Sequence, residues 1–153
     1  MLLLFFIGVL FEVGLDQLTK VVASGPLQQV GTVPLIPDVF HLTYLENRGA
    51  AFGILQDQRW LFAIITVAVV IGVVVFLVRK RPTNKMLVVS LTLLTGGAIG
   101  NLIDRLARGY VVDLFDFRLI NFPIFNVADI FVVVGAFLLA AYLIFIEGKK
   151  EKQ

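Results

Sequence analysis

Residues 96–117 read GGAIGNLIDRLARGYVVDLFDF, and residues 122–129 read FPIFNVAD. Asp113 follows one long apolar run, and Asp129 lies at the start of the next. If both runs cross a membrane, the two carboxylates reach the same rim of that membrane. We therefore expect the rest of the chain to be organised around this stretch and to hold the two aspartates in place.

The composition is that of a membrane protein. Hydrophobic residues make up 59% of the 153 residues, charged residues make up 16%, and the mean hydropathy is +0.95. A soluble domain of this length needs a more polar surface. The length indicates a single domain, residues 1–153. The net charge of +2 gives no support for nucleic-acid binding.

The sequence lacks the residues that several kinds of functional site require. The chain has no cysteine, which excludes a disulfide framework and a thiolate nucleophile, and one histidine, His41, which excludes a His-rich metal site. Neither a P-loop, a GxGxxG motif nor an HExxH motif occurs. We therefore expect no cofactor.

Four apolar stretches predict four membrane-spanning helices. They cover about residues 1–23, 60–78, 86–105 and 127–146. Each approaches the roughly 20 residues that a helix needs to cross about 30 Å of hydrocarbon, where backbone polar groups must be satisfied internally. The first stretch lacks the basic start and the cleavage site of a signal peptide, so we expect a retained helix.

Basic residues predict the orientation. The connector RKRPTNK (79–85) and the tail GKKEKQ (148–153) fall on the side of the N-terminus. Cytoplasmic segments carry an excess of Lys and Arg, so both termini are expected inside and the loops 24–59 and 106–126 outside. In the first loop, VFHLTYLEN (39–47) alternates as a half-buried strand does, and an earlier strand near residues 30–36 is its expected partner.

Charged residues inside the first span are informative because charges are costly in a membrane. Asp16 and Lys20 are spaced i,i+4 and so share a helix face. They form either a rim ion pair or a brace for the aspartate site. Glu12 lies one turn deeper and has no assigned role. Ser24 follows Lys20 by four positions, which leaves a Ser-Lys dyad as an alternative, although Gly25 and Pro26 should end the helix there.

The third span ends in a polar face. Asn101 and Arg105 are spaced i,i+4, whereas Asp104 projects to another face, toward Arg108 or solvent. Three glycines precede them and permit close helix approach: Gly96, Gly97 and Gly100.

Asp113 and Asp129 are 16 positions apart on different elements, so only folding can bring them together. Two adjacent carboxylates share one proton, which suits general acid–base chemistry. Spacing alone leaves open two interfacial aspartates, one of them capping the fourth helix. Asp116 is a competing candidate, and His41 fits a surface role better than a catalytic one.

Four blocks together resemble lipoprotein signal peptidase (signal peptidase II): DQLTK (16–20), ENRGAAFG (46–53), residues 96–117 and residues 122–129. The resemblance implies an all-α, four-helix membrane bundle with a small extracytoplasmic sheet and a short helix in the first long loop. It also implies an aspartic endopeptidase of the bacterial cytoplasmic membrane that works near the extracytoplasmic face. Its substrate would be a diacylglyceryl-modified prolipoprotein, cut on the N-terminal side of the lipidated lipobox cysteine.

The resemblance assigns Asp113 and Asp129 as the catalytic pair. The residues expected to support the site or to contact substrate are Asp16, Lys20, Asn47, Gly97, Asn101, Arg105, Asn126 and Ala128. Asn101 and Arg105 would meet the peptide backbone, and Gly49 and Gly53 would give the covering loop hinge freedom. Membrane lipid and globomycin-type cyclic peptides are the further expected partners, and we expect a monomer.

Two positions depart from the family pattern. Ile130 follows FNVAD where many members carry serine, and Glu12 lies outside the pattern. Two other functions remain open from the residues alone: a small proton-coupled transporter that uses Glu12 or Asp16, and a non-catalytic membrane scaffold.

Overall fold

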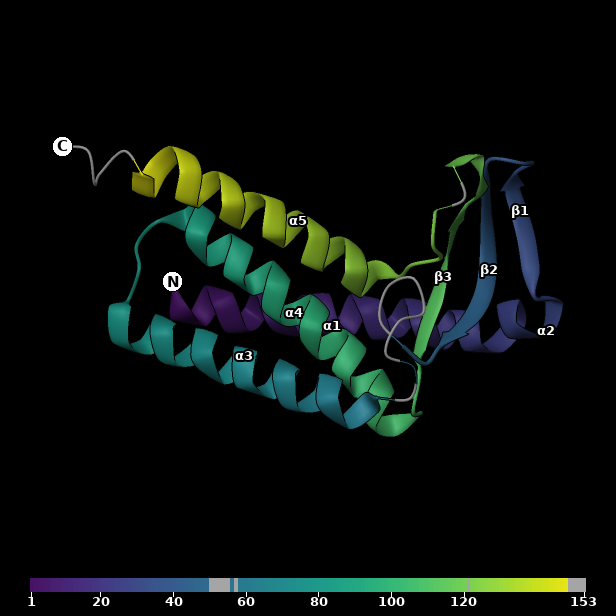
Figure 1. Ribbon diagram of the computed structural model, residues 1–153, viewed down its shortest axis with the longest axis horizontal. Coiled ribbons are helices and arrows are strands. Elements are labelled where there is room, and N and C mark those ends of the chain that lie inside the picture. The colour runs from purple at the N-terminus through teal and green to yellow at the C-terminus, as the bar shows by residue number, and fades with distance from the viewer. Residues whose placement is uncertain (50–55, 57, 121, 149–153) are drawn as a thin grey trace.

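The computed structural model describes residues 1–49, 56, 58–120 and 122–148. Four helical segments run beside one another, and a small sheet stands across one end of them (Figure 1). The segments are Leu2–Val30, Arg59–Lys80, Lys85–Ala107 and Val127–Glu147, and each is long and apolar enough to cross a membrane. The four predicted spans are therefore confirmed as helices.

The first helix extends beyond its predicted end. Helix α1 (Leu2–Val22) continues through a π-helical turn, η1 (Ala23–Leu27), into α2 (Gln28–Val30). The expectation that Gly25 and Pro26 end the helix is wrong, because Pro26 lies inside the π-turn, whose hydrogen-bond pattern differs from that of an α-helix. Gly31, with a φ of 77°, ends the segment instead.

Helices α3 (Arg59–Lys80) and α4 (Lys85–Ala107) are joined by a short connector. Arg81 ends α3 in the left-handed conformation, and the Asn84 side chain caps α4 by accepting a hydrogen bond from Leu87 N at 3.1 Å. Helix α5 (Val127–Tyr142) continues into a second π-helical turn, η4 (Leu143–Glu147). The start of α1, the connector and the end of α5 lie at the end of the bundle away from the sheet (Figure 1).

Helix α4 is central, and its glycines bring its neighbours close, as expected. A Cβ at Gly100 would lie 2.6 Å from Asp16 Oδ2 of α1. A Cβ at Gly96 would collide with the Glu12 carboxylate, and one at Gly97 with the Ala128 carbonyl of α5. These contacts leave no space for a side chain, so the glycines set the distance between α4 and both neighbouring helices.

The sheet has three antiparallel strands in the order β1 (Thr32–Ile36), β2 (Phe40–Asn47) and β3 (Val111–Phe117). The β1–β2 pairing confirms the predicted hairpin. Strand β3, followed by the 3₁₀ turn η3 (Arg118–Ile120), lies in what was expected to be a loop. Its partner is β2, in a register that sets Asn47 opposite Val111 and Leu45 opposite Asp113.

The sheet rests on the extended end of the first helix. Val112 and Leu114 of β3 form a buried cluster with Ala23 and Leu27. This packing gives the extension of α1 an apolar partner and fixes β3 above the ends of α1 and α4. In the described part of the loop 24–59, the only α-helical turn is α2, and Gly53 lies outside the described residues.

Candidate active site

Asp113 lies on β3, and the residue is 1% exposed. The Asn126 amide donates a hydrogen bond to Asp113 Oδ1 at 2.6 Å, and the Asn47 amide donates one to Oδ2 at 3.0 Å. The expected contact of Asn47 with the site thus follows from the β2–β3 register. Burial and, after it, the charge of Asp129 raise the pKa of Asp113 to about 7, against the lowering effect of the two amide donors.

Asp129 occupies the third position of α5 in a capping box. Asp129 N donates to Asn126 Oδ1 at 2.9 Å, and Asn126 N donates to Asp129 Oδ2 at 3.1 Å. The Asn101 amide of α4 donates to Asp129 Oδ1 at 2.8 Å. One aspartate therefore comes from a strand and the other from a helix N-terminus.

Asn126 connects the two carboxylates. Its amide nitrogen donates to Asp113 Oδ1 and to Asn101 Oδ1, and Asn101 in turn donates to Asp129. Asn101 was expected to meet the substrate backbone. Its amide is bonded to protein groups on both sides, which favours a supporting role.

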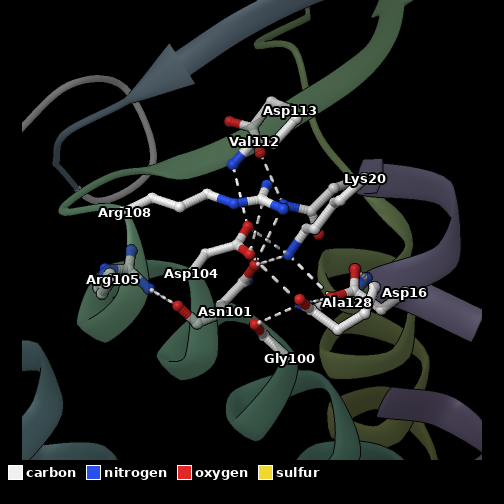
Figure 2. A network of polar contacts seen from close by, with 12 residues as sticks. Asp16, Lys20, Gly100, Asn101, Asp104, Arg105, Arg108, Val112, Asp113 and Ala128 are labelled. Carbon is white, nitrogen blue, oxygen red and sulfur yellow. Dashed lines mark hydrogen bonds and ion pairs between the residues drawn. The ribbon is translucent and has the colours of Figure 1, made fainter. Parts of the chain in front are cut away.

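A cluster of buried charges lies beneath Asp113 (Figure 2). Lys20 Nζ is 2.9 Å from Asp16 Oδ2 and 3.2 Å from Asp104 Oδ2, and all three side chains are 0% exposed. Lys20 also donates to Asn101 Oδ1 at 2.8 Å. The structure therefore places Lys20 and Asp16 next to Asn101, which contacts Asp129, and the contacts of Lys20 are more extensive than those of an i,i+4 pair.

Asp104 was expected to face Arg108 or solvent, and the solvent alternative is wrong. Arg108 NH1 lies 3.8 Å from Asp104 Oδ1, but Asp104 is fully buried. Gln17 Nε2 joins the same cluster, 3.3 Å from Asp104 Oδ1. The missed signal is that Asp104 is i+4 from Gly100, so it continues the face on which the glycines contact α1.

A cavity of about 820 Å³ opens beside both aspartates. Its polar wall includes Asn47, Arg48, Asn101, Arg105, Asp113 and Asp129. Its apolar wall includes Phe122, Pro123, Ile124, Phe125, Ile130, Val132 and Val133. Ile130, the position that departs from the family pattern, therefore adds to the apolar wall.

Arg105 connects the cavity to the loop after β2. Its guanidinium donates to the Gly49 carbonyl at 3.1 Å and lies 4.7 Å from the centre of the Phe62 ring. Gly97 and Ala128 pack against each other where α4 meets α5, and neither is in the cavity wall. Their contribution is to bring Asn101 within reach of Asp129.

The competing candidates lie elsewhere. Asp116 accepts hydrogen bonds from Thr43 at 2.7 Å and Arg118 at 2.9 Å, and it does not line the cavity. Although burial raises its pKa, these partners bring the pKa of Asp116 below its usual value. Ser24 accepts a hydrogen bond from Arg108 at 3.4 Å, whereas Lys20 is engaged by Asp16, Asp104 and Asn101, so the Ser-Lys arrangement is not formed.

Two buried ionisable side chains are outside this network. His41 is 8% exposed rather than at the surface, and neither ring nitrogen has a hydrogen-bond partner among the residues that the structure describes. Glu12 is 6% exposed, and its Oε2 is likewise unpartnered within the described residues.

The chain is similar to known proteins over most of its length. A family model described as signal peptidase (SPase) II matches residues 8–145. A lipoprotein signal peptidase of Clostridioides difficile (strain 630) is 45% identical over 96% of this chain and 99% of that protein. One of Caldanaerobacter subterraneus subsp. tengcongensis is 51% identical over 92% and 95% of the two chains. A solved structure described as a bacterial membrane enzyme matches with a TM-score of 0.87 at 32% identity, over 97% of this chain and 91% of that one.

Proposed function

The chain belongs to the signal peptidase II family, and on that premise we propose that it is an aspartic endopeptidase with Asp113 and Asp129 as its catalytic pair. The family identifies a multi-pass bacterial membrane peptidase that removes signal peptides from prolipoproteins. This membership decides against the transporter and scaffold alternatives. The observation that carries the proposed pair is that both aspartates line one cavity and are linked through Asn126.

The pair shares one proton. The ionised member takes a proton from a water molecule as the water oxygen attacks the carbonyl carbon of the scissile peptide bond. The protonated member gives its proton to the carbonyl oxygen, which forms a tetrahedral diol. Collapse of the diol breaks the C–N bond: the leaving amine receives a proton from one aspartate, and a diol hydroxyl gives a proton to the other, so the pair again holds one proton. The raised pKa of Asp113 supports this assignment, because one carboxyl must keep a proton near neutral pH.

The cavity suits a lipidated peptide. Polar groups lie on the side of the aspartates, and apolar residues of α5 and of the segment before it form the other side. We infer that the peptide bond next to the diacylglyceryl-modified cysteine lies against the polar side while the acyl chains follow the apolar side toward the bilayer. The cut would fall on the N-terminal side of that cysteine.

We also propose the orientation of the protein in the membrane, a class of inhibitor and the oligomeric state. Basic residues Arg79, Lys80, Arg81 and Lys85 gather at the end of the bundle opposite the sheet, which supports cytoplasmic termini and an extracytoplasmic active site. A globomycin-type cyclic peptide would occupy the same cavity, and the enzyme would act as a monomer.

The test is cleavage by purified Asp113→Asn and Asp129→Asn proteins in lipid micelles. The substrate is a diacylglyceryl-modified prolipoprotein, compared with the same unlipidated chain. Each variant should lose at least about 10²–10⁴-fold in turnover, because one proton transfer is removed. Asp116→Asn, on the same strand, is the matched control and should stay within about twofold of the unmodified enzyme. Turnover retained by either Asp113→Asn or Asp129→Asn would falsify the catalytic pair.

A further inference from the structure

We propose that Asp104 is a positioning residue which, with Asp16 and Lys20, sets the spacing between the two catalytic aspartates. The inference rests on the proposed function, because it assigns a role toward that pair. The sequence predicts that Asp104 faces Arg108 or solvent, whereas the structure buries it completely.

The two carboxylates of the cluster make equivalent backbone contacts. Asp104 Oδ2 accepts a hydrogen bond from Val112 N at 3.1 Å, and Val112 immediately precedes Asp113. Asp16 Oδ1 accepts one from Ala128 N at 3.0 Å, and Ala128 immediately precedes Asp129 (Figure 2). A buried carboxylate therefore binds the backbone amide of the residue that immediately precedes each aspartate of the pair.

Lys20 joins these two holding points. Its ammonium lies 2.9 Å from Asp16 and 3.2 Å from Asp104, so β3 and α5 are tied to one cation. It also donates to Asn101 Oδ1, which orients the Asn101 amide so that its nitrogen points at Asp129. The three side chains and two backbone amides thus form a single connected unit.

The charges of this unit balance when Arg108 is included. Two carboxylates face Lys20 and the guanidinium of Arg108, which is 3.8 Å from Asp104. Burying such charges contributes little net stability, since desolvation offsets most of the Coulomb attraction. An arrangement of this kind is therefore better explained by the geometry that it imposes than by stability alone.

The neighbouring residues leave the cluster little freedom. Gly100 gives Asp16 its space, because a Cβ there would lie 2.6 Å from Asp16 Oδ2. Gln17 Nε2 donates to the Gly100 carbonyl at 3.1 Å and lies 3.2 Å from Asp16 Oδ2 and 3.3 Å from Asp104 Oδ1. A change at Asp104 therefore shifts β3 relative to α5, and a misplacement of about 1 Å costs about 10²-fold in rate.

The first experiment compares Asp104→Ala with Asp104→Asn in purified, folded enzyme acting on the lipidated prolipoprotein. Asp104→Ala should lower kcat by about 10–100-fold with KM within about twofold. Asp104→Asn keeps an oxygen that can accept from Val112 N, so it should recover part of kcat. The matched control is Glu12→Gln, a buried carboxylate of the same α1–α4 interface whose Oε2 has no hydrogen-bond partner within the described residues. Its kcat should be unchanged.

The second experiment leaves every side chain in place. Replacing residue 112 with the α-hydroxy analogue of valine turns the Val112 amide into an ester and removes only the donor to Asp104. A lowered kcat with unchanged KM supports the positioning role, even if Asp104→Ala fails to fold. A kcat within twofold of the unmodified enzyme in the ester protein overturns it.

The outcomes separate this inference from the proposed function. If Asp113→Asn is inactive while the ester protein is fully active, only the role of Asp104 fails. If Asp113→Asn keeps its turnover, the catalytic pair fails, and the role of Asp104 fails with it.

Discussion

Asn126 is the side chain on which the geometry of the site depends most. A side-chain amide offers one carbonyl oxygen and two N–H donors. In Asn126 the oxygen accepts from Asp129 N, and the nitrogen donates to Asp113 Oδ1 and Asn101 Oδ1. The side chain is 0% exposed, and both of its N–H donors are used inside the site. A substitution that replaces these donors with an acceptor places that acceptor against the Asp113 carboxylate.

Asn126→Asp should therefore inactivate the enzyme while preserving the start of α5. The new carboxylate can still cap α5 through Asp129 N, but it meets Asp113 without a proton to donate. We expect turnover to fall by at least about 10²-fold, with the helix content measured by circular dichroism unchanged. Asn126→Asp with near-normal turnover would contradict the bridging role of this amide.

Asp113 should make the stability of the protein depend on pH. Its pKa is about 7 in the folded protein and about 3.9 when unfolded. Between these values the folded state holds a proton that the unfolded state has released. The stabilising contribution is therefore complete below about pH 4 and is lost as the pH rises through 7.

The measurement is the Tm in detergent at pH 5 and pH 8. The unmodified protein should lose Tm over this interval, by about 2–4 °C for each kcal/mol lost. In Asp113→Asn the titrating group is absent, so the loss should be smaller. Equal losses in both proteins would show that another group is responsible.

At the scale of elements, α4 determines how the other segments meet. One of its faces presents Gly96, Gly100 and Asp104 to α1, and Gly97 lies against the start of α5. Large residues of α1 face small residues of α4: Glu12 lies at Gly96, and Asp16 lies at Gly100. Because the backbones approach closely, the polar side chains of three helices can reach one another at the end of the bundle next to the sheet.

Gly100→Ala should disturb the site, whereas Gly14→Ala should not. A Cβ at Gly100 would lie 2.6 Å from Asp16 Oδ2, so Asp16 must leave Lys20 or Ala128 N. We expect a loss of about 1–3 kcal/mol in stability and a lowered turnover. Gly14 on α1 has nothing within 4 Å of its Cβ position and should gain helix propensity. The Tm and the turnover of both variants test this expectation. Equal Tm and equal turnover in the two variants would contradict the close packing of Gly100 against Asp16.

At the scale of the whole molecule, the sheet and the basic connector, residues 79–85, lie at opposite ends of the bundle (Figure 1). The candidate site lies where α4, α5 and the sheet meet, at the end away from the basic connector. We propose that the protein lies in the membrane with the arginines and lysines of residues 79–85 on the cytoplasmic side. In this proposed orientation the cavity opens at the outer surface.

Cysteine accessibility tests this orientation without background labelling, since the chain has no cysteine of its own. Lys80→Cys at the end of α3 should react with an impermeant maleimide only after the cells are permeabilised. Gln28→Cys, exposed on α2 beneath the sheet, should react in intact cells. The reverse pattern would overturn the proposed topology.

The sequence by itself determined the four spans, the β1–β2 hairpin and the residues that meet at the site. Hydropathy, strand alternation and motif blocks are local properties, and each is readable within about 20 residues. Hydropathy predicts α5 correctly because its composition leaves no other stable state in lipid.

Only the tertiary structure decided the third strand, the extension of α1 and the burial of Asp104. Strand β3 exists because β2 supplies its hydrogen bonds, and α1 continues past Pro26 because Val112 and Leu114 pack on its last turns. Asp104 turns inward because Lys20, 84 positions earlier, neutralises it. These features depend on partners distant in sequence, whose positions are set only when the helices and the sheet have packed.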